Sequence, residues 1–156
     1  MARVSSVPGK TATINFYNVD GVCLADLPGY GFAKVSKKEQ IRWAELIEGY
    51  FAQERELRLV VLLIDMRHPP QKLDLQMIDF LIDRSLPFLV LLTKSDKLNK
   101  TERADRLEKI RGELPCGGQL TILPFSSETG EGVEQLRDIL SEVCLPEDLD
   151  ETGNDK

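Results

Sequence analysis

Two apolar runs constrain the fold of this chain more than any other feature of its sequence. Leu59 to Ile64 and Phe88 to Leu92 are almost continuously aliphatic, and a polar residue follows each of them. A strand that is apolar on both faces is buried from both sides, which is typical of a parallel sheet covered by helices. Both runs are far too short to span a bilayer. The sequence therefore predicts an α/β fold.

The rest of the chain alternates between strand and helix patterns. Thr13 to Asn18 and Val22 to Leu27 are predicted strands, joined by a hairpin turn at Asp20-Gly21. Ser36-Lys37-Lys38-Glu39 has the pattern of a capping box and predicts a helix from Lys37 to about Arg55. This alternation predicts one mostly parallel sheet with helices on both faces. The other predicted elements are a strand from Leu59 to Asp65, a helix with apolar Leu73, Met77, Phe80 and Leu81, a strand ending at Thr93, a helix from Thr101 to Leu114, a strand from Leu120 to Phe125 and a helix from Val133 to Val143.

The tetrapeptide Thr93-Lys94-Ser95-Asp96 directly follows the second apolar run. A carboxylate at the end of a buried strand can accept hydrogen bonds from N1–H and N2–H of guanine, and adenine offers no such pair of donors. The pattern T/N-K-x-D is the guanine-specificity motif of GTP-binding proteins. We therefore expect Asp96 to select guanine and the stem of Lys94 to cover the face of the base.

Three further segments lie at predicted strand ends or in adjoining loops. In Asp26-Leu27-Pro28-Gly29 the carboxylate can reach a magnesium ion and the glycine amide a γ-phosphate, although such a pattern also suits an ordinary turn. The hydroxyl in Pro8-Gly9-Lys10-Thr11 can bind Mg²⁺ directly, with a polar loop as the alternative. The backbone amides of Phe125-Ser126-Ser127 can donate to O6 of guanine. Open α/β sheets bind ligands at such positions, so the segments together predict a site for GTP or GDP with Mg²⁺.

A longer string carries a resemblance to a known family. Asp26-Leu27-Pro28-Gly29-Tyr30-Gly31 continues, after one residue, into Ala33-Lys34-Val35-Ser36. With it the chain resembles the EngB/YsxC family of bacterial GTPases, which belong to the Era-like, septin-related group of P-loop GTPases. The resemblance extends to about Leu140. Its other matches are Ala2 to Ser6, Pro8 to Thr11, Ile14 to Tyr17, Trp43, Ile64-Asp65, Arg67-His68, Asp74-Leu75, Thr93 to Leu98, and Phe125 to Ser127.

The resemblance implies a role for each motif. Thr11 corresponds to the switch I threonine. The segment Asp26-Leu27-Pro28-Gly29 corresponds to the switch II motif, and Ser126-Ser127 corresponds to the final base-contact motif. Thr93, Lys94 and Asp96 correspond to the guanine motif. The implied protein is a Mg²⁺-dependent GTP hydrolase that acts in ribosome assembly, contacts the large ribosomal subunit or its RNA, and is linked to cell division and septation. Tyr30 stands where Ras-like proteins carry a water-positioning glutamine, which implies slow hydrolysis, and no catalytic residue is assigned.

One part of the family pattern is missing. The family carries a phosphate-binding P-loop, G-x-x-x-x-G-K-[ST], before the switch I threonine, whereas Val4 stands here five positions before Gly9. No strand pattern precedes Gly9 and no helix pattern follows it. We therefore expect an N-terminally truncated member, a fragment or a form read from an internal start, without the first strand and the P-loop helix. The expected consequences are a gap in the middle of the sheet, an open core and weak nucleotide binding.

Composition limits the partners and the compartment. The net charge of −6 argues against non-specific binding of nucleic acid by the whole domain. The three cysteines are widely spaced and fit neither a disulfide framework nor a zinc site. Met1-Ala2-Arg3 leads into polar residues, a pattern from which we expect no secretory signal. We expect a cytoplasmic protein with no membrane partner, and a monomer. Residues 1–145 are predicted to form one domain, and residues 146–156 an acidic, disordered tail.

Two smaller features leave alternatives open. A basic cluster at the start of the first predicted helix has two interpretations. It is either a solvated helix start or a surface that contacts ribosomal RNA in a way that depends on the bound nucleotide. Its members are Lys34, Lys37, Lys38 and Arg42. His68, the only histidine, is interpreted as a turn residue. Two function classes therefore remain: a GTP hydrolase, and a non-hydrolysing module that keeps the guanine half-site and a ribosome-facing surface.

Overall fold

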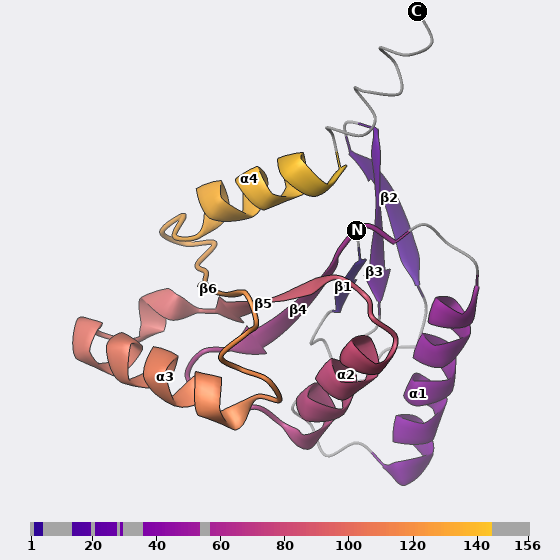
Figure 1. The fold of residues 1–156 in the computed structure, drawn as a ribbon, viewed down its shortest axis with the longest axis horizontal. Helices are drawn as coiled ribbons and strands as arrows, with labels where there is room; N and C mark the ends of the chain where they lie inside the picture. The colour runs from indigo at the N-terminus through magenta and orange to yellow at the C-terminus, as the bar shows by residue number, and fades with distance from the viewer. Residues whose placement is uncertain are drawn as a thin grey trace, which may run out of the picture.

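A computed structural model describes residues 2–4, 14–19, 21–27, 29, 36–53 and 57–144. At its centre is a six-stranded sheet in the order β2-β3-β1-β4-β5-β6 (Figure 1). β2 and β3 form the predicted antiparallel hairpin, and every other neighbouring pair is parallel. The strands are β1 (Ala2–Val4), β2 (Asn15–Val19), β3 (Val22–Leu27), β4 (Val60–Asp65), β5 (Phe88–Thr93) and β6 (Ile122–Pro124).

The predicted gap in the middle of the sheet is wrong, because β1 fills it. Ala2 lies opposite Ala25 of β3 and also opposite Val60 of β4, and both pairings are parallel. A strand of three residues is too short to show a hydrophobic period, so no pattern indicated it. The inner edges of β3 and β4 are therefore paired opposite β1, and the hairpin is joined to the rest of the sheet.

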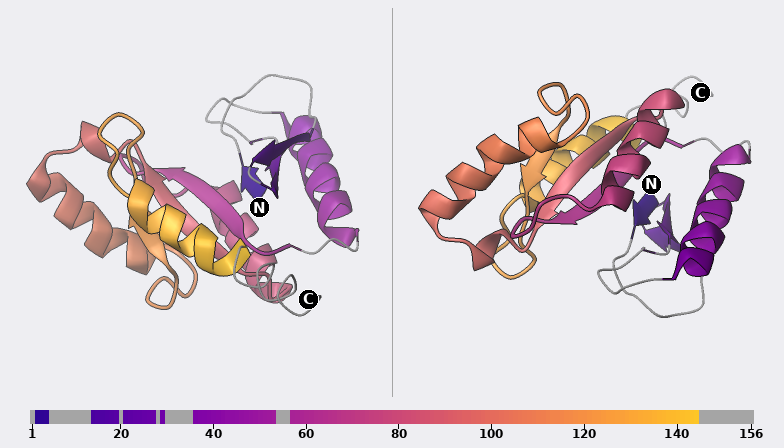
Figure 2. Two further views of the ribbon diagram at one scale, coloured as in Figure 1. Left: turned by 90° about the horizontal axis from the view of Figure 1, so that it is seen from above. Right: turned by 90° about the horizontal axis from the view of Figure 1, so that it is seen from below.

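Among the described residues, four helices cover the sheet, with α1, α2 and α3 on one face and α4 on the other (Figure 2). Buried residues of α1, α2 and α3 pack in one cluster with alternate residues of β3 to β6, and α4 packs on the opposite face. The predicted arrangement of helices on both faces is confirmed. The helices are α1 (Lys37–Ala52), α2 (Lys72–Asp83), α3 (Lys100–Glu113) and α4 (Val133–Cys144), and a short 3-10 helix, η1 (Ser95–Lys97), follows β5.

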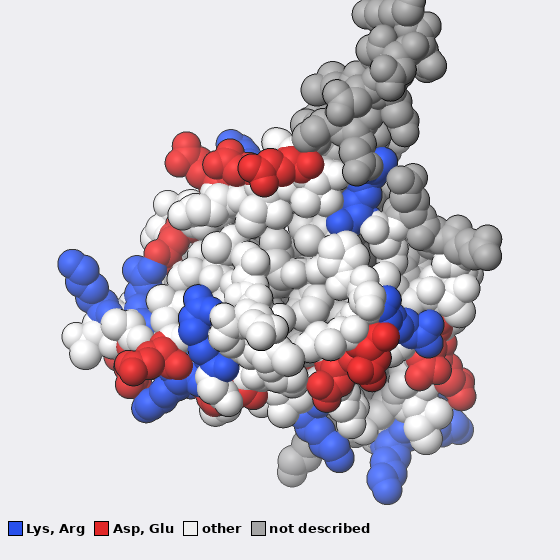
Figure 3. Space-filling view, viewed as in Figure 1, with Lys and Arg blue, Asp and Glu red and all other residues white. Residues whose placement is uncertain are grey.

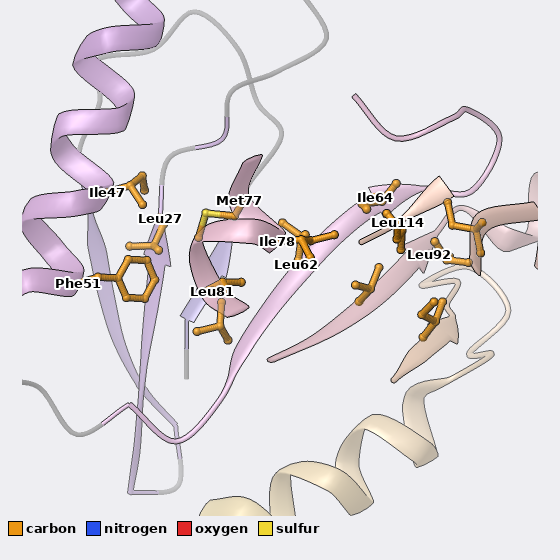
Figure 4. Packing of buried hydrophobic residues seen from close by; sticks show 14 of the residues in the cluster. Leu27, Ile47, Phe51, Leu62, Ile64, Met77, Ile78, Leu81, Leu92 and Leu114 are labelled. Carbon is orange, nitrogen blue, oxygen red and sulfur yellow. The ribbon is translucent and has the colours of Figure 1, made fainter. Parts of the chain in front are cut away.

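The two apolar runs are buried for the reason the sequence indicated. In β4, Leu62 and Ile64 face the cluster beneath α1 to α3, whereas Val61 between them faces the α4 side. β5 alternates in the same way, with Leu92 on the first face and Leu91 on the second. Figure 4 shows side chains of the larger cluster lying between the strands and the helices. A strand with two buried faces needs an apolar residue at every position.

The helix α1 closes the core next to the hairpin. Ser36 Oγ accepts a hydrogen bond from the Glu39 amide at 3.2 Å, which caps the helix as predicted. The helix ends at Ala52 and not at Arg55, which lies outside the described residues. Its buried Tyr50 and partly buried Trp43 pack in the larger core cluster.

Charged side chains on the face shown in Figure 3 are not gathered in one field. On the face shown in Figure 3, acidic and basic side chains are interspersed around the periphery, and uncharged atoms fill the middle. Within the described ranges, no helix combines the length and the apolar composition needed to cross a membrane. Residues 145–156 lie outside the described residues, so the predicted acidic tail stays a prediction.

Candidate nucleotide-binding site

The carboxyl ends of the parallel strands meet at one edge of the sheet. Asp65 at the end of β4 lies opposite Thr93 of β5, and Leu92 lies opposite Pro124 of β6. Asp26 of β3 lies opposite Arg3 of β1, which in turn lies opposite Val61 of β4. Asp26 is therefore level with Val61, four residues before Asp65, and three strand spacings from β5. With about 4.8 Å between strands and about 3.3 Å per residue along them, Asp26 lies roughly 20 Å from Thr93. The segment predicted for the base lies at the carboxyl edge, whereas Asp26 lies back from that edge, toward the hairpin.

The loop after β5 is held in a tight and specific conformation. Thr93 Oγ1 donates to the carbonyl of Ile64 at 3.3 Å, and the Ser95 amide donates to the carbonyl of Phe125 at 3.1 Å. Lys94 has a φ of 59°, in the left-handed region that is uncommon for residues other than glycine. The chain turns sharply there into η1. Ser95 is fully buried, which leaves Lys94 and Asp96 on the outer side of the turn.

The two loops predicted to contact the base are joined by a hydrogen bond. Ser126 Oγ donates to Asp96 Oδ1 at 2.8 Å and accepts from the amides of Glu128 and Thr129, each at 3.2 Å. Ser126 is 1% exposed, so these bonds are shielded from water. Asp96 Oδ2 lies 3.8 Å from Lys97 Nζ. The carboxylate of Asp96 is therefore held in one orientation by the neighbouring loop.

A buried carboxylate lies beneath Lys94. Asp65 accepts from the Arg67 amide at 3.0 Å and from Arg67 Nε and Nη2 at 3.0 and 2.8 Å, and its Oδ2 lies 3.7 Å from Lys94 Nζ. Burial by itself would raise the pKa of Asp65, but the hydrogen bonds from Arg67 and the charges of Arg67 and Lys94 outweigh it and lower that pKa below its ordinary value. Asp65 stays charged and holds Lys94 at the base-binding edge.

A second acidic residue connects three elements behind the site. Glu131 Oε1 accepts from Ser95 Oγ at 2.5 Å, and Glu131 Oε2 accepts from Arg103 Nη2 of α3. The Glu131 carbonyl accepts from the Ser126 amide at 3.0 Å. Glu131 therefore contacts both base-contact loops.

The structure brings together the base-contact residues but not all the predicted site residues. The two base-contact segments, Thr93 to Asp96 and Phe125 to Ser127, are neighbours. The Phe125 amide donates to the Leu92 carbonyl at 2.7 Å, and Ser127 is exposed. The side chain of Leu27 lies in the core, so only its backbone can face a ligand. Asp26 and Gly29 are half-buried, and Asp26 is level with Val61 of β4 rather than with Asp65 at the edge. Four predicted residues lie outside the described residues: Gly9, Lys10, Thr11 and Pro28.

Three residues of the site received no role from the sequence. Asp65 follows an apolar run directly, as Thr93 does, so its position was a usable signal. Arg67 follows two residues later. At this spacing the Arg67 guanidinium can chelate the Asp65 carboxylate, and the Arg67 backbone amide can donate to the same carboxylate. Glu131 had no signal, because it lies 36 residues from Ser95. His68 lies in the turn after β4, where its amide donates to the Asp65 carbonyl at 3.2 Å, so the turn interpretation is confirmed.

Comparisons with known proteins agree with this geometry. The family model described as 50S ribosome-binding GTPase matches residues 1–94. The probable GTP-binding protein EngB of Thermotoga petrophila is 48% identical over 142 residues, covering 90% of this chain and 73% of that protein. A crystal structure of a probable GTP-binding protein EngB has a TM-score of 0.68 at 22% identity, covering 91% of this chain and 96% of that one. The structure of Era with MgGDPNP and nucleotides of 16S ribosomal RNA has a TM-score of 0.58 at 17% identity, covering 91% and 55% of the two chains.

The sheet order and the loops at its carboxyl edge define the class: the fold is that of GTPases. The chain belongs to the 50S ribosome-binding GTPase family and, within it, to the EngB group of GTP-binding proteins, whose members are GTP hydrolases. The resemblance found in the sequence is therefore confirmed.

Proposed function

We propose that this chain binds GTP and GDP at the carboxyl edge of the sheet, with the guanine base between the loops after β5 and β6. The observation that carries the proposal is the orientation of Asp96, which Ser126 Oγ holds at 2.8 Å through one carboxylate oxygen. The carboxylate can then accept from N1–H and N2–H of guanine without losing freedom on binding. An adenine base offers no donors at these two positions.

The neighbouring residues have complementary roles in the same proposal. Lys94, drawn toward Asp65 at 3.7 Å, covers one face of the base with its aliphatic stem. The backbone amides of Ser126 and Ser127 are candidates to donate to O6, although the Ser126 amide already donates to the Glu131 carbonyl at 3.0 Å, which favours Ser127. Thr93 supports the loop through its bond to Ile64 and does not itself need to touch the nucleotide.

The phosphates and a magnesium ion would lie toward β3. Asp26 is half-buried near the end of this strand and offers a carboxylate, the ligand type that Mg²⁺ prefers. Among the described residues there is no group of three or more acidic, histidine or cysteine side chains that could hold a metal. This fits Mg²⁺ in a nucleotide site, because the ion there needs only one or two protein ligands besides phosphate and water. We propose Asp26 and Thr11 as these ligands, and Gly9, Lys10 and the Asp26–Gly29 backbone as phosphate contacts.

Hydrolysis would release inorganic phosphate when water attacks the γ-phosphorus and the bond to the bridging oxygen breaks. Mg²⁺ would supply charge neutralisation on the phosphates, and this chain's residues would position them. We further propose, from the family to which the chain belongs, a cytoplasmic role in assembly of the large ribosomal subunit and an associated effect on cell division. The family match favours this GTP hydrolase over a non-hydrolysing module.

Titration of the whole chain with GTP and with ATP, followed by NMR chemical shifts, tests base selection. The wild type should prefer GTP, and Asp96→Ala should lose this preference at a cost on the order of 1.5–3 kcal/mol, because a bidentate contact to a charged group disappears. Asp96→Asn should instead gain affinity for XTP, since the asparagine amide can donate to the C2 oxygen of xanthine. Asp79→Ala on the exposed side of α2 is the matched control. An unchanged GTP preference in Asp96→Ala would exclude Asp96 as the selector.

Thr11 is expected to act through Mg²⁺ and the γ-phosphate. Thr11→Ala should weaken binding of a non-hydrolysable GTP analogue and leave GDP affinity nearly unchanged, because only the triphosphate gives this threonine a partner. Parallel titrations with and without Mg²⁺ measure the effect. Equal losses for both nucleotides would contradict the assignment.

A further inference from the structure

The interior side of the base-contact loops contains a cluster that base recognition does not use directly. The cluster consists of Ser95 from η1, Glu131 from the loop after β6, and Arg103 from α3. Glu131 accepts from Ser95 Oγ at 2.5 Å and from Arg103 Nη2 through its other oxygen. We name these three residues the Glu131 cluster.

We propose that Glu131 is a positioning residue for guanine selection, which fixes the loop after β5 against the loop after β6 so that Asp96 is aimed at the base. This inference rests on the proposed function of Asp96. It adds a residue that touches neither the nucleotide nor Asp96 and acts through Ser95 and Ser126.

The covalent neighbours of the cluster explain how it would act. Ser95 is directly followed by Asp96, so a fixed Ser95 leaves the Asp96 backbone little freedom. On the opposite side, the Glu131 carbonyl accepts from the Ser126 amide at 3.0 Å, and Ser126 Oγ is the group that holds Asp96. One glutamate therefore anchors the residue before the selector and the residue that orients the selector.

Burial makes these contacts costly to lose. Ser95 is fully buried, whereas the side chains of Glu131 and Arg103 are each 32% exposed, so without the carboxylate the buried Ser95 hydroxyl would lose its observed acceptor. Arg103 Nε is buried and has no hydrogen-bond partner within the described ranges, so the bond from Nη2 to Glu131 is the principal hold on this guanidinium. Hydrogen bonds to a charged acceptor are short and comparatively strong, which suits a fixed spacer between loops.

The test compares GDP with IDP, whose base lacks the N2 amine, in NMR titrations of the full chain. The ratio of the two affinities reports how well Asp96 reaches N2–H. We expect Glu131→Ala to weaken GDP binding by about tenfold, the equivalent of one hydrogen bond to a charged group, and to weaken IDP binding less. Glu131→Gln should keep the wild-type ratio, because its amide oxygen can accept from Arg103 while its NH₂ group donates to Ser95 Oγ.

Glu134→Ala, at an exposed position in the first turn of α4, is the matched control and should change neither affinity. Ser95→Ala combined with Glu131→Ala should add little to either single change, because both remove the same contact. If Glu131→Ala lowers the melting temperature but leaves the GDP-to-IDP ratio unchanged, Glu131 is only structural and the proposal is overturned.

A ligand-free readout separates this inference from the proposed function. If the wild type shows no preference for GDP over ADP, the proposed function fails, and a crystal structure of Glu131→Ala decides the inference alone. Separation of Ser126 Oγ from Asp96 Oδ1, now 2.8 Å apart, would support positioning by Glu131. Retention of that hydrogen bond would overturn it.

Discussion

At the scale of single residues, two buried carboxylates carry opposite pKa shifts because their neighbours differ. Asp65 has a cation on either side, and Arg67 and Lys94 keep its pKa low despite burial. Asp74 lies in the first turn of α2, and within the described ranges only the Gln71 amide donates to it, at 2.8 Å. Burial therefore dominates and raises the pKa of Asp74 to about 6, from an ordinary value of 3.8.

Arg67→Ala should destabilise the protein at neutral pH, because it leaves a buried carboxylate without its chelating hydrogen bonds. A carboxyl group with a lowered folded pKa contributes stability above its unfolded pKa and loses it as the pH falls through the folded value. The difference between variant and wild type should therefore shrink below about pH 4. Urea unfolding at several pH values measures it, with exposed Arg137→Ala as the control. A difference that stays constant with pH would contradict this pairing.

Asp74→Asn should change the pH dependence of stability in the opposite sense. With a raised folded pKa, the folded state holds a proton that the unfolded chain has already lost, so this contribution is full below pH 3.8 and disappears as the pH rises past about 6. Asparagine does not titrate and can still accept from the Gln71 amide. The variant should gain on the wild type between these pH values, by up to about 1.4 kcal/mol for each pKa unit. Asp79→Asn on the same helix is the control, and equal pH profiles for all three proteins would contradict the assignment.

At the scale of elements, the loop after β6 contains a glycine that any other residue would replace only with strain. Gly132 has a φ of 82°, and a Cβ there would lie 2.4 Å from the carbonyl oxygen of Pro124. Gly130 has a similar φ of 84° but open space around it. The same loop carries Ser126 and Glu131, so the close approach of Gly132 to β6 sets the position of both.

Gly132→Ala should cost more than about 1 kcal/mol, because the strain of a positive φ is added to a clash with backbone that cannot move aside. Gly130→Ala should show the strain alone, and Gly118→Ala, with neither a positive φ nor a close neighbour, should be nearly neutral. Thermal unfolding and GDP titration measure the series. The loss of stability should be largest for Gly132→Ala, smaller for Gly130→Ala and smallest for Gly118→Ala. Equal losses for Gly132→Ala and Gly130→Ala would show that the close approach to Pro124 does not matter.

At the scale of the whole molecule, β1 decides whether the chain has one core. It joins the hairpin to β4, and Leu27 of β3 and Val60 of β4 are both fully buried in the same cluster. Single domains of this size with one continuous core usually unfold in one cooperative step. The fold no longer supports the expectation of an open core.

The purified chain of residues 1–156 should unfold cooperatively and still bind GTP weakly. No stretch of these residues matches G-x-x-x-x-G-K-[ST], and a base contact alone must offset the entropic cost of association, estimated at several kcal/mol. Calorimetry of unfolding and of GTP binding measures both properties. Micromolar affinity would show that another segment serves as the phosphate cradle, and unfolding in two separate steps would show that β1 does not join the hairpin to the core.

The sequence by itself determined the longer elements, though not β1, and most of the base-contact residues. Continuous apolar runs fix β4 and β5, because only strands buried on both faces need them, and the polar residues that follow mark the edge where ligands bind. Local patterns such as Ser36 with Glu39 fixed helix starts for the same reason: the interacting groups are near in the chain.

Tertiary structure alone decided the closure of the sheet and the support of the site. β1 is too short to carry a pattern, and it becomes a strand because β3 and β4 offer it hydrogen bonds on both sides. Glu131 meets Ser95 across 36 residues of sequence. Contacts of this kind leave no local period or spacing, because the distance between the partners is set by the packing of the strands between them and not by the chain that connects them.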